Sequence, residues 1–430
     1  MPEWAKDPPR RRRVCHPVPV NEACGRDTLR KLNLPSRAEI RRAVHGGDFV
    51  CCLDAASFVD QFPISDDVGR FFCFRDKEGA LYRLTAMAMG QRQSTEVVTA
   101  LMRVLCAFDH DGVRVDIATD NLRFVGGFDA VFRAVKTFCS RCDAVGVVLN
   151  ELPRGASDAQ IADAISHQAD FLGEVMDYAA KTVHVRQKIT DRIGELWALR
   201  DSWTSRQHVG LIASLLWVSS PLRVDVAEKY HAMSFLRAQG RRLHFQPELW
   251  DFTIAVPPEA MAEVHAWVDV ALRNEPTAVP EAPTEPDLTL FTDASAWGWG
   301  AASFNGSDVK LVQYPWGDSL DGKDHSTVAE PEAIWRALCR FVDPRKRCTV
   351  RVASDHSAFL AAWKRGFSPA AGYNGVIVRI KRRFPLMTLV PTHIAGVSNP
   401  VDALSRGPAS PQDLDRARHG VLGRGGVSSA

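Results

Sequence analysis

Four acidic residues in the C-terminal part of the chain stand where apolar runs end or helices begin. Asp293 and Asp355 each follow an apolar, β-rich run, and a Gly- and Trp-rich segment comes directly after Asp293. We expect Glu330 in the first turn of a helix, and Asp402 at the start of a last short helix. Carboxylates that converge from different elements can hold two divalent cations and catalyse phosphodiester chemistry. The set therefore predicts a two-metal nuclease site.

Taken singly, each of these residues has an ordinary explanation. An Asp after a strand commonly serves as a turn or cap residue, and a Glu at a helix start is favoured by the helix dipole. His393, which follows another apolar run, is on its own more often a structural loop residue. The acids in this order favour a site, and beside it His393 is a candidate proton shuttle.

The chain divides into segments that must position these residues. We expect an α+β palm-type region over residues 1–185 and an amphipathic helical region over 186–273. Four prolines make 274–286 a semi-rigid linker. A compact α/β block over 287–407 carries the four acids. The remaining 408–430, rich in Gly, Ser and Arg, is expected to be a flexible tail.

Composition narrows the class of protein. The chain has 430 residues, a hydrophobic content of 46% and a net charge of +2, which fits a multi-domain globular protein with local rather than global basic character. No apolar run approaches the roughly 20 residues of a membrane span. Ten cysteines without regular spacing predict free thiols in a reducing compartment, hence an intracellular protein of the nucleus or cytoplasm. The one CxxC has no second ligand pair near it, which disfavours zinc.

The motifs around the C-terminal acids resemble the RNase H domain of retroelement polyproteins over about 120 residues. They are Thr-Asp-Ala-Ser-Ala-Trp-Gly-Trp-Gly from residue 292, Glu-Pro-Glu-Ala from 330, Ser-Asp-His from 354 and His-Ile-Ala-Gly-Val-Ser-Asn-Pro-Val-Asp-Ala-Leu-Ser-Arg from 393. The resemblance implies that the metal ligands are Asp293, Glu330, Asp355 and Asp402, and that His393 is the mobile catalytic histidine. Glu332 is the rival of Glu330, and the spacing to the alanine that follows favours Glu330.

The N-terminal part resembles a reverse transcriptase. The segments are Leu-Asp-Ala-Ala-Ser-Phe-Val-Asp-Gln-Phe-Pro-Ile from residue 53, Ala-Met-Ala-Met-Gly-Gln-Arg-Gln-Ser from 86, Ile-Ala-Thr-Asp-Asn-Leu-Arg-Phe-Val-Gly from 117, Gly-Val-Val-Leu-Asn from 146 and Phe-Leu-Gly-Glu from 171, the last resembling the primer grip. The resemblance implies that Asp54 and Asp120 hold two Mg²⁺ or Mn²⁺ ions, with Asn121 beside them. Residues expected to contact nucleotide or template are Arg12 or Arg13 with Asn21, and Arg70, Gly90, Gln91 and Ser94.

This sequence departs from the reverse transcriptase pattern at three places. Asn121 stands where a second hairpin acid is usual, which removes a charge from the metal site. Val59 stands where an aromatic residue usually screens out ribonucleotides, unless Phe58 takes that role. The basic segment lies close to residue 1, so we expect the fingers to be short. The residues of these motifs are most similar to those of tyrosine-recombinase retrotransposons of the DIRS order, of the VIPER and TATE type.

Together these features predict a fold of the α+β and α/β classes: a right-hand polymerase palm and fingers with a helical thumb or connection, followed by an RNase H-like domain. The resemblance implies a polymerase that copies RNA or DNA into DNA and a nuclease that degrades the RNA of RNA–DNA hybrids. Its partners would be hybrid, primer–template and deoxynucleoside triphosphates, with no membrane; the oligomeric state stays open. A late basic cluster would grip phosphates: Lys364, Arg365, Arg379, Lys381, Arg382 and Arg383.

Two alternatives belong to other classes. One is a decayed or domesticated copy that binds nucleic acid with at most RNase H activity, motivated by Asn121, Val59 and the short N-terminus. The other is an RNase H domain fused to an unrelated scaffold, which predicts that Asp54 and Asp120 lie far apart.

Overall fold

The computed structural model describes residues 2–3, 10–11, 18–23, 32, 34–282 and 285–425. Arg12 and Arg13, predicted to contact nucleotide, lie outside the described residues. The chain forms two compact units. The first comprises Met1–Gln187 and Glu275–Glu281, and the second comprises Lys188–Asn274 and Ala282–Ala430.

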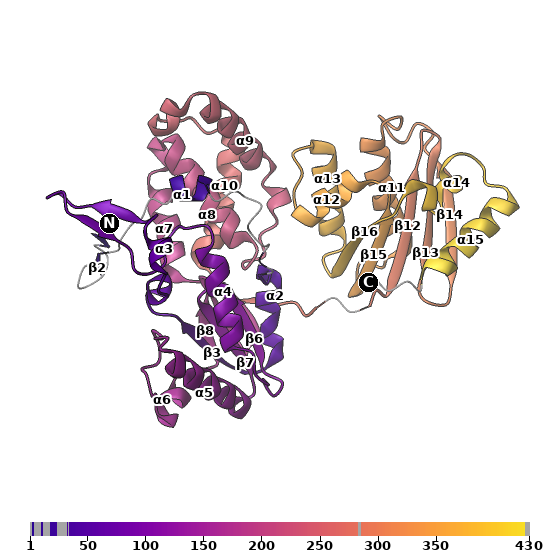
Figure 1. Cartoon of the computed structure of the whole chain (residues 1–430). Coiled ribbons are helices and arrows are strands. Elements are labelled where there is room, and N and C mark those ends of the chain that lie inside the picture. Colours follow the sequence, from indigo (N-terminus) through magenta and orange to yellow (C-terminus); the bar gives the residue numbers. More distant parts are fainter. Residues whose placement is uncertain are drawn as a thin grey trace. The chain divides into compact units, whose positions relative to one another are not determined.

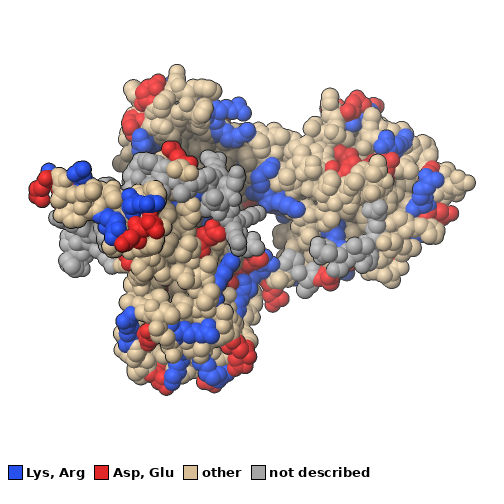
Figure 2. Space-filling model, in the orientation of Figure 1, with Lys and Arg blue, Asp and Glu red and all other residues tan. Residues whose placement is uncertain are grey.

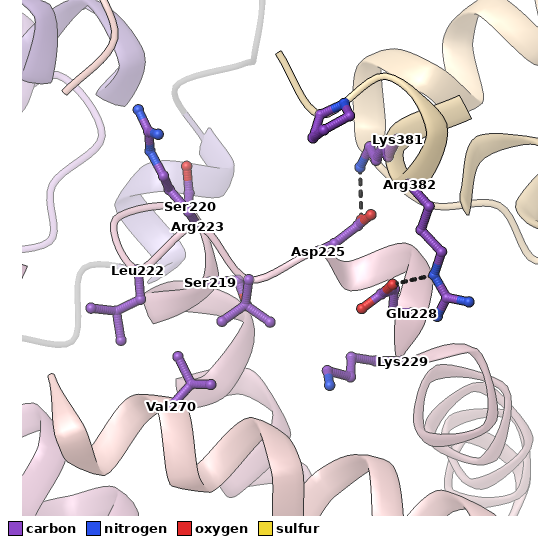
Figure 3. Close-up of a pocket in the computed structure, with 12 residues that line it drawn as sticks. Ser219, Ser220, Leu222, Arg223, Asp225, Glu228, Lys229, Val270, Lys381 and Arg382 are labelled. Atoms are coloured by element: carbon purple, nitrogen blue, oxygen red, sulfur yellow. Dashed lines mark hydrogen bonds and ion pairs between the residues drawn. The ribbon is translucent and has the colours of Figure 1, made fainter. Parts of the chain in front are cut away.

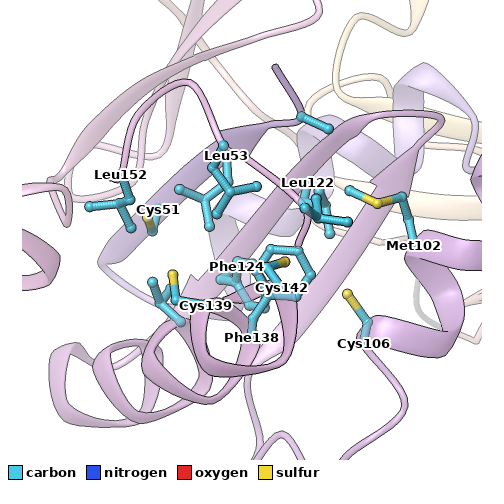
Figure 4. Packing of buried hydrophobic residues seen from close by; sticks show 14 of the residues in the cluster. Cys51, Leu53, Met102, Cys106, Leu122, Phe124, Phe138, Cys139, Cys142 and Leu152 are labelled. Carbon is cyan, nitrogen blue, oxygen red and sulfur yellow. The ribbon is translucent and has the colours of Figure 1, made fainter. Parts of the chain in front are cut away.

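A three-stranded antiparallel sheet is the centre of the first unit. Its order is β3 (Phe49–Asp54), β7 (Asn121–Gly126) and β6 (Arg114–Ala118). Because side chains alternate along a strand, Cys51 and Leu53 face helices α4 (Ser94–Leu105) and α5 (Phe128–Val145), where Phe124 and Phe138 pack with them (Figures 1 and 4). The helices thus cover one face of the sheet, and Asp54 and Asp120 lie at the ends of its strands.

The other face of this sheet packs against a second sheet. Its order is β11 (Thr277–Ala278), β10 (Thr182–Val185), β9 (Glu174–Asp177) and β8 (Gln168–Phe171). Val50 and Val125 contribute to the core between them, together with helix α2 (Arg37–Arg42). Shorter elements complete the unit: β1 (Pro2–Glu3), β2 (Arg10–Arg11), α1 (Val18–Ala23), α3 (Asp66–Gly69), the hairpin β4 (Cys73–Arg75) and β5 (Leu81–Arg83), and α6 (Asp158–Asp163).

The prediction that 274–286 is only a linker is wrong for its middle part. Thr277 and Ala278 pair with β10, and Val279 is buried in the core of the first unit. The His45 imidazole Nε2 also lies 3.0 Å from the carbonyl oxygen of Val279. The small and β-branched residues of this segment suit a strand at a sheet edge. The prolines on either side favoured a linker instead, so the strand was not predicted.

Four helices form the first part of the second unit: α7 (Gln187–Ala198, whose first residue belongs to the first unit), α8 (Ser205–Ser219), α9 (Tyr230–Phe245) and α10 (Pro258–Arg273). Their apolar sides bury two tryptophans, Trp203 and Trp267. The indole of Trp267 donates a hydrogen bond to Ser219 Oγ at 3.0 Å, so its polar atom is satisfied inside the core.

The rest of the second unit is a five-stranded mixed sheet in the order β14-β13-β12-β15-β16. The strands are β12 (Leu288–Ala294), β13 (Gly298–Phe304), β14 (Val309–Pro315), β15 (Cys348–Ser354) and β16 (Met387–His393). The first three are antiparallel, and β15 and β16 run parallel to β12. Parallel β12 and β15 therefore end at the same edge, where Asp293 and Asp355 stand.

Helices cover both faces of this sheet. Leu290 faces a core formed with α11 (Ser326–Phe341), α12 (Ser357–Arg365) and α13 (Ala371–Arg383). The next residue, Phe291, faces the opposite core, formed with α14 (Asp402–Ser405) and α15 (Pro411–Gly425). Figure 1 shows these two layers on either side of the strands. This double cover explains why β12 reads as a continuous apolar run.

The prediction of a flexible tail from residue 408 is wrong for α15. Ala417 and Val421 are buried against the sheet. Their spacing of four residues puts both on one face of a helix, a signal that the many glycines and arginines obscured.

The predicted fold class, α+β and α/β with a helical middle region, is confirmed. Within the described ranges, no helix is long and apolar enough to cross a membrane.

Candidate metal centre

The predicted C-terminal acids meet at one edge of the five-stranded sheet. Asp293, Glu330 and Asp355 each offer a carboxylate oxygen, and these oxygens all lie within 4.8 Å of one another. Asp293 and Glu330 are buried, at 4% and 7% exposure. Three carboxylates at this separation match the oxygen ligands that Mg²⁺ and Mn²⁺ prefer.

Glu330 reaches the cluster from inside a helix. Helix α11 begins at Ser326, so the prediction that Glu330 lies in its first turn is wrong, and Pro331 lies within the helix. Glu330 Oε1 accepts a hydrogen bond from the backbone N–H of Ala294 at 3.3 Å, while the buried Oε2 has no hydrogen-bond partner among the described residues. An unsatisfied buried carboxylate oxygen is costly unless a ligand meets it. The residues therefore fit a divalent cation.

Glu332, the alternative to Glu330 as a metal ligand, forms ion pairs with two arginines. Its carboxylate accepts hydrogen bonds from Arg336 at 3.1 Å and from Arg379 at 2.6 Å. The two glutamates are similarly buried, but only Glu330 lies with Asp293 and Asp355. Two residues at this spacing on a helix point in nearly opposite directions, about 160° apart.

Burial raises the pKa of both buried acids. The pKa of Glu330 is raised to about 9, mainly by burial and then by the charges of Asp293 and Asp355. The pKa of Asp293 is raised to about 7, again mainly by burial, although a hydrogen bond from Ser405 lowers it. Such shifts arise where like charges are gathered in a desolvated place.

The C-terminal motif fixes the orientation of Asp293. Ser405 Oγ donates to Asp293 Oδ2 at 2.5 Å, and Asn399 Nδ2 donates to Asp293 Oδ1 at 3.1 Å. Ser405 and Asn399 had no assigned role in the sequence analysis, although both lie in the motif that ends at residue 406. Their polar types and their proximity to Asp402 were the only available signal.

Asp402 lies next to the cluster but outside the 4.8 Å group. Arg406 binds its carboxylate with two hydrogen bonds, from Nε at 2.8 Å and from Nη2 at 2.6 Å. His393 is exposed at the end of β16, in register with Ser354, which directly precedes Asp355. The structure thus places His393 at the same sheet edge as the acids.

Two glycines allow neighbouring segments to pack closely at the sheet edge that carries the acids. A Cβ on Gly300 of β13 would lie 2.5 Å from Leu404 Cβ and 2.9 Å from its carbonyl carbon, so only glycine lets α14 rest on the sheet. A Cβ on Gly396 would lie 2.8 Å from an oxygen of Asp355. Both glycines therefore support the positions of acids.

The acids of the first unit also meet. Asp54 at the end of β3 pairs with Asn121 of β7, and the backbone N–H of Ala55 donates to the carbonyl oxygen of Asp120 at 3.3 Å. The alternative of Asp54 and Asp120 lying far apart is wrong. Asn121 Nδ2 donates to Asp120 Oδ1 at 3.0 Å. The turn before it holds Thr119 at φ 66°, a strained conformation for a β-branched residue.

Two further polar residues surround Asp54. Asn150 Nδ2 donates to Asp54 Oδ2 at 2.8 Å, and the backbone N–H of Asp54 donates to Glu151 Oε2 at 2.7 Å. Asp54 Oδ1 is buried with no hydrogen-bond partner among the described residues. Burial, followed by the charge of Asp120, raises the pKa of Asp54, and burial raises the pKa of Glu151. Glu151 was not predicted, though it directly follows residues 146–150, which resemble a reverse transcriptase motif.

The predicted nucleotide-binding residues around Gly90 occupy a turn and the start of a helix, where Ser94 is buried. Gly90 has φ 86°, and its carbonyl oxygen accepts a hydrogen bond from Asn21 Nδ2 at 2.9 Å. After Gln91, Ser94 opens α4 and donates to the carbonyl oxygen of Ala88 at 3.0 Å. Arg70 is exposed with its guanidinium 5.1 Å from the ring centre of Phe71.

Val59, where an aromatic residue was expected, is buried at 3% exposure and packs in the core of the first unit.

The basic cluster of the C-terminal domain divides into two groups. Lys381 binds Asp225 at 2.7 Å and Arg382 binds Glu228 at 2.8 Å, both within the second unit (Figure 3). With the Arg379 pair described above, half of the cluster is engaged by acids. The other three predicted phosphate-binding residues, Lys364, Arg365 and Arg383, are exposed.

A short segment before α9 connects helices α7 to α10 with the five-stranded sheet and its helices. Asn374 Nδ2 donates to the carbonyl oxygen of Ala227 at 2.6 Å, and Ala227 is buried in the core of the sheet domain. The neighbouring cavity, about 760 Å³, is lined by Arg223 and Lys229 besides the two ion pairs. Elsewhere, Lys and Arg side chains alternate with Asp and Glu on the face in Figure 2, in keeping with the net charge of +2.

No protein-family model and no curated protein matches the chain. Solved structures of the foamy viral protease–reverse transcriptase resemble it at low identity. The complex of its dRH form with double-stranded DNA has 10% identity and a TM-score of 0.44, over 86% of this chain and 62% of that one. A further complex with double-stranded DNA has 11% identity and a TM-score of 0.39, over 85% and 72%. The complex with RNA/DNA hybrid has 11% identity and a TM-score of 0.42, over 89% and 48%. The chain therefore spans less than two thirds of the first and third of these chains.

Proposed function

We propose that the second unit is a divalent-cation-dependent nuclease that cleaves the RNA strand of RNA–DNA hybrids. The cluster of Asp293, Glu330 and Asp355 with the unsatisfied Glu330 Oε2 carries the proposal. Mg²⁺ or Mn²⁺ bound there would supply a Lewis acid and lower the pKa of a bound water. The exposed cations Lys364, Arg365 and Arg383 supply phosphate contacts.

In this mechanism the protein orients its ligands and moves one proton. Asn399 and Ser405 hold both oxygens of Asp293, so that its direction is set before a substrate arrives. Asp402 is assigned as the fourth ligand. His393, exposed at the same edge, takes part in proton transfer to or from the leaving group.

The test is RNA cleavage in a labelled RNA–DNA hybrid by the full chain with Mg²⁺. Glu330→Gln should abolish cleavage, whereas Glu332→Gln, at a similarly buried position on the same helix, should retain it. Folding of both variants is checked by circular dichroism. Retained cleavage in a folded Glu330→Gln protein would refute the assignment.

We propose a second activity, DNA synthesis by a reverse transcriptase, for the first unit. Its support is the adjacency of Asp54 and Asp120 at paired strand ends, with Glu151 as a third carboxylate. The substrates would be primer–template and deoxynucleoside triphosphates, and the helical region would act as thumb and connection. The element type, tyrosine-recombinase retrotransposon of the DIRS order, belongs to the same proposal.

Primer extension decides between this activity and a decayed copy. Extension by the wild type above an Asp54→Ala control supports polymerase activity. No extension, together with binding of primer–template, would favour the copy that only binds nucleic acid and keeps its nuclease. Sequencing the neighbouring reading frames tests the element type, because a recombinase frame is expected beside this one.

A further inference from the structure

We propose that Arg406 is a built-in counter-ion that competes with a divalent cation for Asp402. The inference rests on the proposed nuclease site and assigns a positioning residue within it. In this view Arg406 holds the fourth carboxylate outside the cluster until a cation displaces the guanidinium.

The geometry of the pair is the first support. The guanidinium binds both oxygens of Asp402, through Nε at 2.8 Å and Nη2 at 2.6 Å. A planar guanidinium matches a carboxylate in this two-bond arrangement. Each oxygen that would face a metal ion therefore already has a cationic partner, and Asp402 alone of the four predicted ligands lies outside the 4.8 Å group.

The surroundings of the pair are the second support. The backbone is fixed, since Ser405 bonds to Asp293 and Leu404 is fully buried against β13. The two side chains are free to move, because the Arg406 side chain is 68% exposed and the Asp402 side chain is 37% exposed. A fixed backbone with an exposed charged end allows the ion pair to open without unfolding α14.

The charge distribution is the third support. The charges of Asp293 and Asp355 also act on Arg406, in addition to that of Asp402. A cavity of about 580 Å³ beside the site is lined by Asp355, Asp402, Arg406 and Arg416. Arg406 therefore interacts with the charges of the acids, and the cavity gives the released guanidinium space, where a phosphate of the substrate could receive it.

The experiment measures Mn²⁺ binding by calorimetry, without substrate, to the full chain carrying Asp54→Ala, which removes a ligand of the metal site proposed for the first unit; the wild-type sequence and every variant at the second site are compared in this background. Because an exposed ion pair is weak, Arg406→Gln should bind Mn²⁺ only about two- to fivefold more tightly than wild type. Arg406→Lys should lie between the two. Arg416→Gln, which removes another arginine of the same cavity, should leave the affinity unchanged.

A double-mutant cycle separates a direct competition from a general charge effect. In an Asp402→Asn background, Arg406→Gln should lose most of its effect on Mn²⁺ affinity. Unchanged or weaker binding by a folded Arg406→Gln protein would overturn the proposal, as would an equal gain in the Asp402→Asn background.

Failure of this inference is distinguishable from failure of the nuclease assignment. If Asp293→Asn weakens Mn²⁺ binding but Arg406→Gln does not strengthen it, only the role of Arg406 fails. If Asp293→Asn binds Mn²⁺ as tightly as wild type, the metal centre itself is refuted.

Discussion

The two acidic sites of this chain are built differently. In the first unit, Asp54 and Asp120 are brought together by the pairing of neighbouring strands, and Asn121 and Asn150 provide amide donors. In the second unit, the acids come from two parallel strands and a helix, and two of them, Asp293 and Glu330, are more deeply buried than Asp54 and Asp120. The first site therefore combines carboxylates with amide groups, whereas the second gathers carboxylates with an unsatisfied buried oxygen.

The largest expected effect is the separation of the two activities. Asp293→Asn should slow RNA cleavage by at least about 100-fold, because a lost metal ligand removes several kcal/mol of transition-state stabilisation. The same variant should leave primer extension unchanged, and Asp54→Ala should do the reverse. Gel assays of both activities on both variants check this. Loss of both activities in either variant would contradict the comparison.

Metal should stabilise the second site in a pH-dependent way. The folded-state pKa values of Asp293 and Glu330 are raised, to about 7 and about 9, so the metal-free protein loses stability as the pH rises through these values. Mg²⁺ relieves this loss, and its binding releases protons. At a free Mg²⁺ concentration of 100 times Kd, the gain is about 2.7 kcal/mol.

Thermal melts with EDTA or Mg²⁺ at pH 6.5 and 9 test this expectation. The difference between the two melting temperatures should be larger at pH 9 and small in Glu330→Gln at either pH. An equal difference at both pH values in wild type would show that these acids do not bind the ion.

A glycine tests how the fourth acid is placed. Gly300→Ala should destabilise the second unit by about 1–3 kcal/mol through overpacking against Leu404, and should reduce RNA cleavage because α14 carries Asp402. Gly375→Ala in α13, where the added Cβ meets nothing within 4 Å, should be neutral or stabilising. Chemical denaturation and the cleavage assay measure both. A Gly300→Ala protein as stable and active as wild type would show that α14 can shift freely.

The smallest effects distinguish structural cations from phosphate-binding ones. Lys381→Ala should cost at most about 1 kcal/mol of stability, since it removes the ion pair with Asp225. Lys364→Ala should leave stability unchanged and lower hybrid affinity, with a salt dependence reduced by about one phosphate contact. Chemical denaturation of both variants measures their stability, and hybrid binding over a salt series measures their affinity. The reverse pattern would exchange the two roles.

Much of the fold followed from the sequence because strand and helix periods are local. The acids stand at strand ends because an apolar run must stop where a charge begins, which was visible for Asp54, Asp293 and Asp355. The roles that were not predicted depend on distant contacts. Glu151 is positioned by a backbone N–H almost a hundred residues earlier, and Asn399 reaches Asp293 only through the folded loop.

The errors have the same origin. Helix α15 was not predicted because its glycines and arginines are typical of a flexible segment. Its two buried apolar residues, Ala417 and Val421, indicate a helix only once they are seen to pack against the sheet. The ion pairs within the basic cluster were also not predicted, because the acids that engage Lys381 and Arg382 lie more than 150 residues earlier. Charge in a sequence shows where cations are, but only the fold shows which of them remain available.

Strand β11 has a consequence for the order of folding. It completes a sheet of the first unit, yet it is synthesised only after all of α7 to α10. The pairing of β10 with β11 closes a long loop, and such non-local contacts form late. On the ribosome, the first unit therefore stays unfinished at one edge until the helical region has emerged, and a chain stopped before residue 277 would leave that edge of β10 exposed to intermolecular pairing.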